Sequence, residues 1–301
     1  MEFWDFTCVS CLRTLPYVKE WHRKYQQYGL VVIGVHTPKF PFGKNPELVQ
    51  KAIERNGIQY PVVMDNEGVI AARYELRAWP SMYLIDKHGF IRYQHTGEGN
   101  YTTTERVLQA LLYDTLSGET LPMLLEPLRE EDRAGAVLYR STPELQAGYL
   151  RGSIGNVEGY SPESVVQYAD PEFYLDDRIY VVGCWLNDRN SVRHQDREPG
   201  SIILSYHATE VSAVLEPEGG EAEIVLMQDD RYLSAENKGD DVRIAGDGRS
   251  IVTISEPRVY HLVKNPQYGE HVLRISTESE GLALYSFMFV SSVIPELVSN
   301  N

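Results

Sequence analysis

Two cysteines, Cys8 and Cys11, stand three residues apart at a point where an extended stretch gives way to a helical pattern. The aromatic-rich residues 2–6 predict a short strand, and apolar side chains then recur at nearly helical spacing, at Leu12, Leu15, Val18, Trp21, Tyr25 and Tyr28. One helical turn brings the two thiols within bonding reach. The pair therefore restricts the fold to one that has a strand-to-helix junction where both sulfurs can react.

The elements predicted after this junction alternate between strand and helix. They are a buried-type strand at 30–35, a helix at 46–55, a strand at 61–64, a short helix at 69–76, a hairpin of 81–85 and 90–95, and a helix at about 103–116. Right-handed crossovers place such units on one central sheet. Residues 1–116 are therefore predicted to form an α/β domain on a thioredoxin-like plan.

From residue 178 the pattern changes to short runs in which apolar and polar residues alternate. The predicted strands are residues 179–182, 201–208, 222–227, 242–244, 251–254, 259–263, 271–276 and 282–290. Such a series without an intervening helix indicates an all-β sandwich or jelly roll over residues 178–295. Residues 117–177, rich in Pro and Gly, are predicted to be a linker and docking segment.

The net charge of −15 lies almost entirely in the second part of the chain. Residues 1–115 carry 13 Lys and Arg against 12 Asp and Glu, whereas residues 116–301 carry 15 against 31. Because an acidic surface repels phosphate groups, we expect neither nucleic acid nor an anionic membrane surface as a partner. We also expect no membrane segment in this chain, since it has no run of about 18 apolar residues and no signal-peptide pattern.

The cysteine pair carries the predicted chemistry. Unpaired N–H groups and the helix dipole favour an anionic sulfur at the helix start, so Cys8 is expected to attack a substrate disulfide and the more buried Cys11 to resolve the mixed disulfide. A zinc site needs two further ligands, and the third cysteine, Cys184, lies far along the chain. A structural disulfide is the other alternative. Cys184 is predicted to be a small buried apolar residue.

Pro80, in the run Ala78-Trp79-Pro80-Ser81, comes directly before the first strand of the hairpin. In a thioredoxin-like topology this position lies beside the cysteines, and we predict a cis peptide bond before Pro80. The bend leaves the backbone of Trp79 free to pair with an extended substrate segment near Cys8. Trp79 and Pro80 are therefore the predicted substrate-binding residues.

Residues 3–112 carry a resemblance to a known family in the strings FWDFTCVSCLRTLPYVKEWHRKY, GLVVIGVHTPKF, YPVVMDNEG and AWPSMYLIDKHGFIRYQHTGEGNY. They resemble the thioredoxin-like domains of TlpA and ResA type. The likeness is strongest to the extracytoplasmic carboxy-terminal half of DipZ-type cytochrome-c-biogenesis proteins, where a β-sandwich resembling a carbohydrate-binding module follows the thioredoxin domain. The resemblance implies Cys8 as attacking thiol, Cys11 as resolving thiol, Pro80 as cis proline, and a periplasmic or cell-surface location.

Lys39 departs from the pattern of these similar proteins. They often read HTPEF where this chain reads HTPKF, and related proteins place near this point a glutamate thought to manage the proton of the resolving thiol. His36, His95 and Glu98 are the substitutes within the domain, although an isolated histidine is more often an ordinary surface or core residue.

The sequence therefore predicts a thiol-disulfide oxidoreductase that acts on protein disulfides or dithiols together with an electron-donor protein, and it indicates neither a cofactor nor a metal. A peroxidase is disfavoured because such proteins usually carry a Thr-x-x-Cys arrangement. No catalytic or metal-ligand constellation stands out among the histidines of the second domain, which are His194, His207, His261 and His271.

The alternative function is a glycan- or protein-binding module in which the redox domain is auxiliary. Sugar rings would stack on exposed aromatic side chains, for which the candidates are Trp185, Tyr206, Tyr232 and Tyr260. At strand spacing, however, such residues more often belong to the core.

Overall fold

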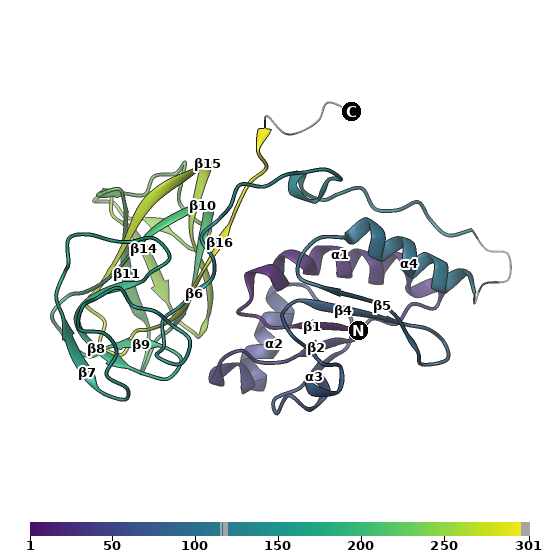
Figure 1. Ribbon diagram of the computed structural model, residues 1–301, viewed down its shortest axis with the longest axis horizontal. Helices are drawn as coiled ribbons and strands as arrows, with labels where there is room; N and C mark the ends of the chain where they lie inside the picture. The colour runs from purple at the N-terminus through teal and green to yellow at the C-terminus, as the bar shows by residue number, and fades with distance from the viewer. Residues whose placement is uncertain (115, 117–119, 296–301) are drawn as a thin grey trace. The chain divides into compact units, whose positions relative to one another are not determined.

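The chain forms two compact units, Met1–Ala136 and Val137–Asn301, in a computed structural model that describes residues 1–114, 116 and 120–295 (Figure 1). Each unit has its own hydrophobic core. Among the described residues, no helix combines the length and the hydropathy that a membrane span requires.

A five-stranded sheet in the order β3-β2-β1-β4-β5 forms the centre of the first unit. The strands are β1 (Glu2–Trp4), β2 (Gly34–His36), β3 (Val62–Met64), β4 (Ser81–Ile85) and β5 (Ile91–Thr96). The first three run parallel to one another, whereas β4 and β5 are antiparallel to their neighbours. This is the predicted thioredoxin-like arrangement, and it places β1, the strand that leads into the cysteines, in the middle of the sheet.

Helices cover both faces of this sheet (Figure 1). They are α1 (Val9–Tyr25), α2 (Pro46–Arg55), α3 (Val69–Arg73) and α4 (Tyr101–Tyr113), with 3₁₀ turns at Gln26–Tyr28, Pro41–Lys44 and Glu130–Asp132. Successive side chains of a strand point to opposite faces. Accordingly, Trp4 packs in the core that α1, α2 and α4 share, whereas Phe3 packs with Ala71 of α3.

The first unit extends beyond residue 116, so it includes part of the segment predicted to be a linker. Leu121 is buried in its core, and the N–H of Leu125 donates to the carboxylate of Glu105 on α4 at 2.8 Å. The N–H of Leu128 donates to the hydroxyl of Tyr17 on α1 at 2.7 Å. These contacts hold the described residues 120–136 on the first unit, while residues 137–177 belong to the second.

The second unit is an antiparallel β-domain, in agreement with the predicted all-β class. Its main sheet path runs β13-β14-β11-β15-β10-β16-β9-β8-β7, and β10 also pairs with β8. The strands are β6 (Leu145–Gln146), β7 (Val165–Tyr168), β8 (Tyr180–Asn187), β9 (Val192–His194), β10 (Gly200–Glu216), β11 (Ala222–Gln228), β12 (Arg231–Tyr232), β13 (Arg243–Ile244), β14 (Ser250–Ile254), β15 (Arg258–Thr277) and β16 (Ala283–Val290).

The two longest strands, β10 and β15, pair with each other over most of their length. The prediction of separate strands at 259–263 and 271–276 was wrong, because the residues around Pro266 form an irregularity inside one continuous strand. Ala208 of β10 pairs with Gly269 of β15, whereas Glu210 pairs with Lys264. The register therefore shifts between these two pairs. The prediction that this strand ends at residue 208 was wrong, because β10 continues through the irregularity to Glu216.

The four aromatic residues considered for sugar stacking differ in exposure. Trp185, Tyr206 and Tyr260 are fully buried, whereas Tyr232 is 44% exposed. Three of the four are therefore core residues and present no face to a ligand.

Candidate active site

The amino terminus of α1 presents Cys8. This residue is the N-cap, with extended backbone torsions of φ −98° and ψ 106°, and its Sγ accepts the N–H of Cys11 at 3.2 Å. Its own N–H donates to the carbonyl of Asp5 at 3.1 Å. An ionised sulfur accepts such a hydrogen bond more strongly than a neutral one. The local fold thus places the Cys8 sulfur at the start of α1 with a backbone N–H directed at it.

Cys11 lies one helical turn further into the protein. Both cysteines are free thiols, with 5% of Cys8 exposed and none of Cys11. Burial raises the pKa of the Cys11 thiol well above its usual range, and the adjacent Cys8 sulfur raises it further. The inner thiol therefore keeps its proton until a base removes it.

Cys184, the third cysteine, belongs to the second unit, on β8. Its Sγ donates to Oε1 of Gln167 at 2.6 Å, and the side chain is partly exposed. The prediction of a buried apolar residue was therefore wrong. Cys184 of β8 stands opposite Gln167 of β7 in the sheet, and the side chain of Gln167 gives the thiol a polar partner.

The peptide bond between Trp79 and Pro80 is cis, as predicted. Ser81 pairs with Phe3 across β4 and β1, so Pro80 lies at the end of β1 from which the chain continues to Cys8. Trp79 packs against the core cluster that contains both cysteines. Among the hydrogen bonds of the described residues, none uses the backbone N–H or carbonyl of Trp79. A substrate backbone can pair with these groups.

Asp5, a residue that the sequence interpretation missed, is a fully buried acid directly after β1. Its Oδ1 accepts hydrogen bonds from the backbone and side chain of Thr7, and its Oδ2 accepts the backbone N–H of Lys39 at 2.9 Å. A backbone hydrogen bond joins Asp5 to Cys11, and the charge of the Asp5 carboxylate raises the pKa of that thiol further. Asp5 is therefore a buried acid whose backbone contacts Cys11 and whose charge acts on the Cys11 thiol.

His36, one of the residues considered as a substitute base, accompanies Asp5. It is fully buried at the end of β2, its ring stacks on Phe6, and its Nε2 lies 3.7 Å from Oδ2 of Asp5. Burial lowers the pKa of His36, although the charge of Asp5 acts in the opposite direction. The imidazole is therefore neutral beside the carboxylate.

The other two substitutes make contacts of a different kind. Glu98 accepts a hydrogen bond from Nε of Arg13 at 2.9 Å, in a surface ion-pair group that also contains Arg129. His95 approaches the carbonyl of Glu98 at 3.3 Å. The backbone N–H of Lys39 donates a hydrogen bond to Asp5. Lys39 stands where the family has a glutamate, and its backbone therefore holds a different acid in place. A carboxyl residue inside an aromatic run was the sequence signal for Asp5.

Glu2 is a second buried carboxyl, on β1 itself. It is 2% exposed, and its Oε2 accepts the hydroxyl of Tyr60 at 2.9 Å. Burial raises the pKa of Glu2 from 4.5 to about 7, against the opposing effect of the Tyr60 hydrogen bond. The folded state therefore binds a proton that the unfolded chain has already lost between these two pH values.

We expect Glu2→Gln to remove a pH dependence of stability. The raised pKa of Glu2 makes its full contribution to the free energy of unfolding below pH 4.5, and this contribution is lost as the pH rises through about 7. The loss is about 3 kcal/mol for a shift of this size. The variant should therefore gain stability relative to wild type between pH 5 and pH 8, measured by urea unfolding with tryptophan fluorescence. Glu54→Gln, on the exposed side of α2, is the control. An equal difference at both pH values would contradict the expectation.

Comparison with known proteins agrees with this fold. Residues 1–94 match the AhpC/TSA family, and residues 142–289 match the family described as thioredoxin like C-terminal domain. The first unit has a thioredoxin-like fold and is similar in sequence to a thiol-disulfide oxidoreductase of ResA type.

Over most of its length the chain is similar to Protein DipZ of Mycobacterium bovis, with 30% identity over 292 residues that cover 96% of this chain and 38% of DipZ. It thus spans less than half of that relative. Thiol-disulfide oxidoreductase ResA of Geobacillus kaustophilus is 29% identical over 111 residues, which cover 37% of this chain and 61% of ResA. Among solved structures, a thiol-disulfide isomerase from Corynebacterium glutamicum has 28% identity and a TM-score of 0.35, covering 40% of this chain and 79% of its own.

Proposed function

We propose that this chain exchanges disulfides in protein substrates through Cys8 and Cys11. The observation that carries the proposal is the asymmetry of the two thiols. Cys8 caps α1 and accepts the N–H of Cys11, whereas Cys11 is fully buried beneath it with a raised pKa. An outer sulfur at a helix start and an inner thiol with a raised pKa are the two components that a dithiol reductant requires.

The reaction proceeds in two exchange steps. The Cys8 thiolate attacks one sulfur of the substrate disulfide, the substrate S–S bond breaks, and the other substrate sulfur leaves and takes up a proton. Cys11 then loses its proton and attacks the Cys8 sulfur, which releases the second substrate thiol. The substrate gains two electrons and two protons, and the chain is left with a Cys8–Cys11 disulfide. An electron-donor protein with a dithiol returns it to the reduced state by the reverse exchange.

The substrate is an extended protein segment that pairs with the backbone of Trp79. The support is that the described hydrogen bonds leave this backbone unused next to a cis proline at the end of β1. Main-chain pairing binds many sequences with similar strength, which suits a protein that acts on several substrates. We place this activity outside the cytoplasmic membrane, on the basis of the resemblance to DipZ-type and ResA-type proteins.

Asp5 is the group that accepts the proton of Cys11 in the second step. Its carboxylate is buried, its position is set by Thr7 and Lys39, and its backbone contacts Cys11. A carboxylate placed close to a thiol can accept its proton as a general base. This role would replace that of the glutamate missing at Lys39.

We expect insulin-disulfide reduction from the full chain and from residues 1–136 at rates within a few fold of each other, since the described contacts of Cys8 and Cys11 lie in the first unit. Residues 1–116 should be less stable, because this truncation removes Leu121 and the hydrogen bonds from Leu125 and Leu128. Turbidity of reduced insulin measures activity, and circular dichroism confirms folding. A folded, inactive 1–136 fragment would mean that the second unit completes the active site.

A further inference from the structure

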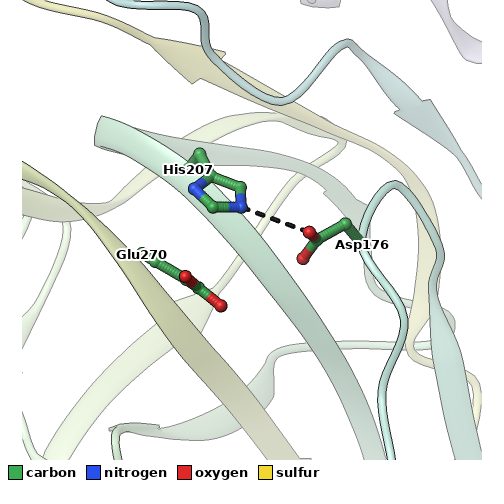
Figure 2. A group of neighbouring side chains, drawn as sticks. All are labelled: Asp176, His207 and Glu270. Atoms are coloured by element: carbon green, nitrogen blue, oxygen red, sulfur yellow. Dashed lines mark hydrogen bonds and ion pairs between the residues drawn. The ribbon is translucent and has the colours of Figure 1, made fainter.

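Three ligand-type side chains of the second unit converge on one face of β10 and β15 (Figure 2). Asp176, His207 and Glu270 each offer one donor atom, and these atoms all lie within 4.8 Å of one another. This group, which includes His207, was not identified from the sequence. Strand pairing assembles the group from residues that are distant in sequence.

Backbone pairing fixes the place of all three residues. His207 of β10 stands directly opposite Glu270 of β15, and residues so paired in an antiparallel ladder share one face. Asp176 forms a β-bridge with Ser205 of β10. Ser205 stands two residues before His207, so the side chains of these two residues lie on the same face of the strand. Thr142 holds the backbone of His207 through hydrogen bonds of 2.9 Å to both its N–H and its carbonyl.

One pair of donor atoms already has the spacing that a small metal ion requires. Nε2 of His207 lies 3.3 Å from Oδ2 of Asp176, and two ligands of a tetrahedral ion at Zn–N and Zn–O distances are roughly 3.3 Å apart. The hydroxyl of Ser205 donates to the other oxygen, Oδ1, of Asp176 at 2.6 Å, which orients the carboxylate. Glu270 is exposed and can turn toward the same point.

The charge of the group also suits a cation. Among the described residues, no Lys or Arg forms an ion pair with Asp176 or Glu270, and His207 is the one charged-type partner of Asp176. A pocket of about 290 Å³ adjoins the group and is lined by Asp176, His207, Arg140 and Tyr268, among others. A metal held by three side chains here would keep open coordination positions toward the pocket.

We propose that Asp176, His207 and Glu270 bind one divalent transition metal ion of the Zn²⁺ type on the second unit. One imidazole with two carboxylates is a donor set that suits Zn²⁺ and its neighbours in the first transition row. Ca²⁺ takes six to eight oxygen ligands and has little affinity for imidazole nitrogen. This site goes beyond the proposed redox function, and none of its residues takes part in the dithiol chemistry.

Isothermal titration of the full chain with Zn²⁺ tests the proposal. Cys8 and Cys11 are both changed to Ser for this experiment, so that their thiolates do not compete for the metal. We expect one Zn²⁺ per chain, and His207→Gln and Asp176→Asn should each weaken binding by at least about tenfold because each removes one of three ligands. Glu270→Gln is a third variant at an exposed position.

Asp177→Asn is the matched control. Asp177 lines the same pocket but is not one of the three ligands, and Asn tolerates its positive φ of 58°. It should bind Zn²⁺ within about twofold of the parent chain, and a tenfold excess of Ca²⁺ should not displace the metal. Absence of Zn²⁺ binding, equal binding by His207→Gln, or displacement by Ca²⁺ would each overturn the proposal.

Discussion

Cys8→Ser will lose insulin-disulfide reduction, to less than about one thousandth of the wild-type rate, because a hydroxyl does not attack a disulfide at neutral pH. Cys11→Ser will still attack through Cys8 but will not resolve the product. It should accumulate a mixed disulfide with substrate, visible on a non-reducing gel and identified by mass spectrometry. The two variants thus separate the attacking thiol from the resolving thiol.

Cys184→Ser is the control for this pair. Its thiol lies in the second unit, where it hydrogen bonds with Gln167, and the variant should reduce insulin at the wild-type rate. Full turnover by Cys8→Ser would refute the roles proposed for the two thiols. A mixed disulfide trapped by Cys8→Ser and not by Cys11→Ser would reverse them.

The local signals of the sequence led to the right fold around the cysteines. A strand that ends just before Cys8 and a helical period that begins at Cys11 depend only on neighbouring residues, and the structure has β1 and α1 at those places. The cis bond at Pro80 needed one further step, the topology of the sheet, because the residues themselves do not determine the isomer.

The features that the sequence did not predict depend on contacts between distant residues. Asp5 stands in a strand-like run, and an acidic residue in such a run usually lies on the solvent side. Only the packing of residues 36–43 over Asp5 shows that its side chain is buried. Likewise, His207 and Glu270 become neighbours through the register of β10 and β15. Proline and polar residues inside those two long strands are typical of turns, so their length was underestimated.

Asp5→Asn should slow the second exchange step by about ten- to a hundredfold at pH 7, because the amide cannot accept the proton of Cys11. The amide oxygen keeps an acceptor for Thr7 or Lys39, so the loop remains in place. The variant also lacks the charge that raises the pKa of Cys11. Hydroxide can therefore replace the missing base as pH rises, and the variant should approach the wild-type rate in alkaline solution.

The two steps can be timed separately with an aromatic disulfide reagent, dithionitrobenzoate, which releases one coloured thiolate when Cys8 attacks and a second when Cys11 resolves. Asp5→Asn should leave the first phase within about threefold of wild type and slow only the second, since general-base help is needed only where a protonated thiol must attack. Asp65→Asn is the matched control: Asp65 is also a buried acid after a strand, but its oxygens accept the N–H groups of Ile70 and Ala71. Glu98→Gln tests the surface carboxylate paired with Arg13. An Asp5→Asn variant with an unchanged second phase, or an equal slowing in Asp65→Asn, would show that the proton of Cys11 leaves by another route.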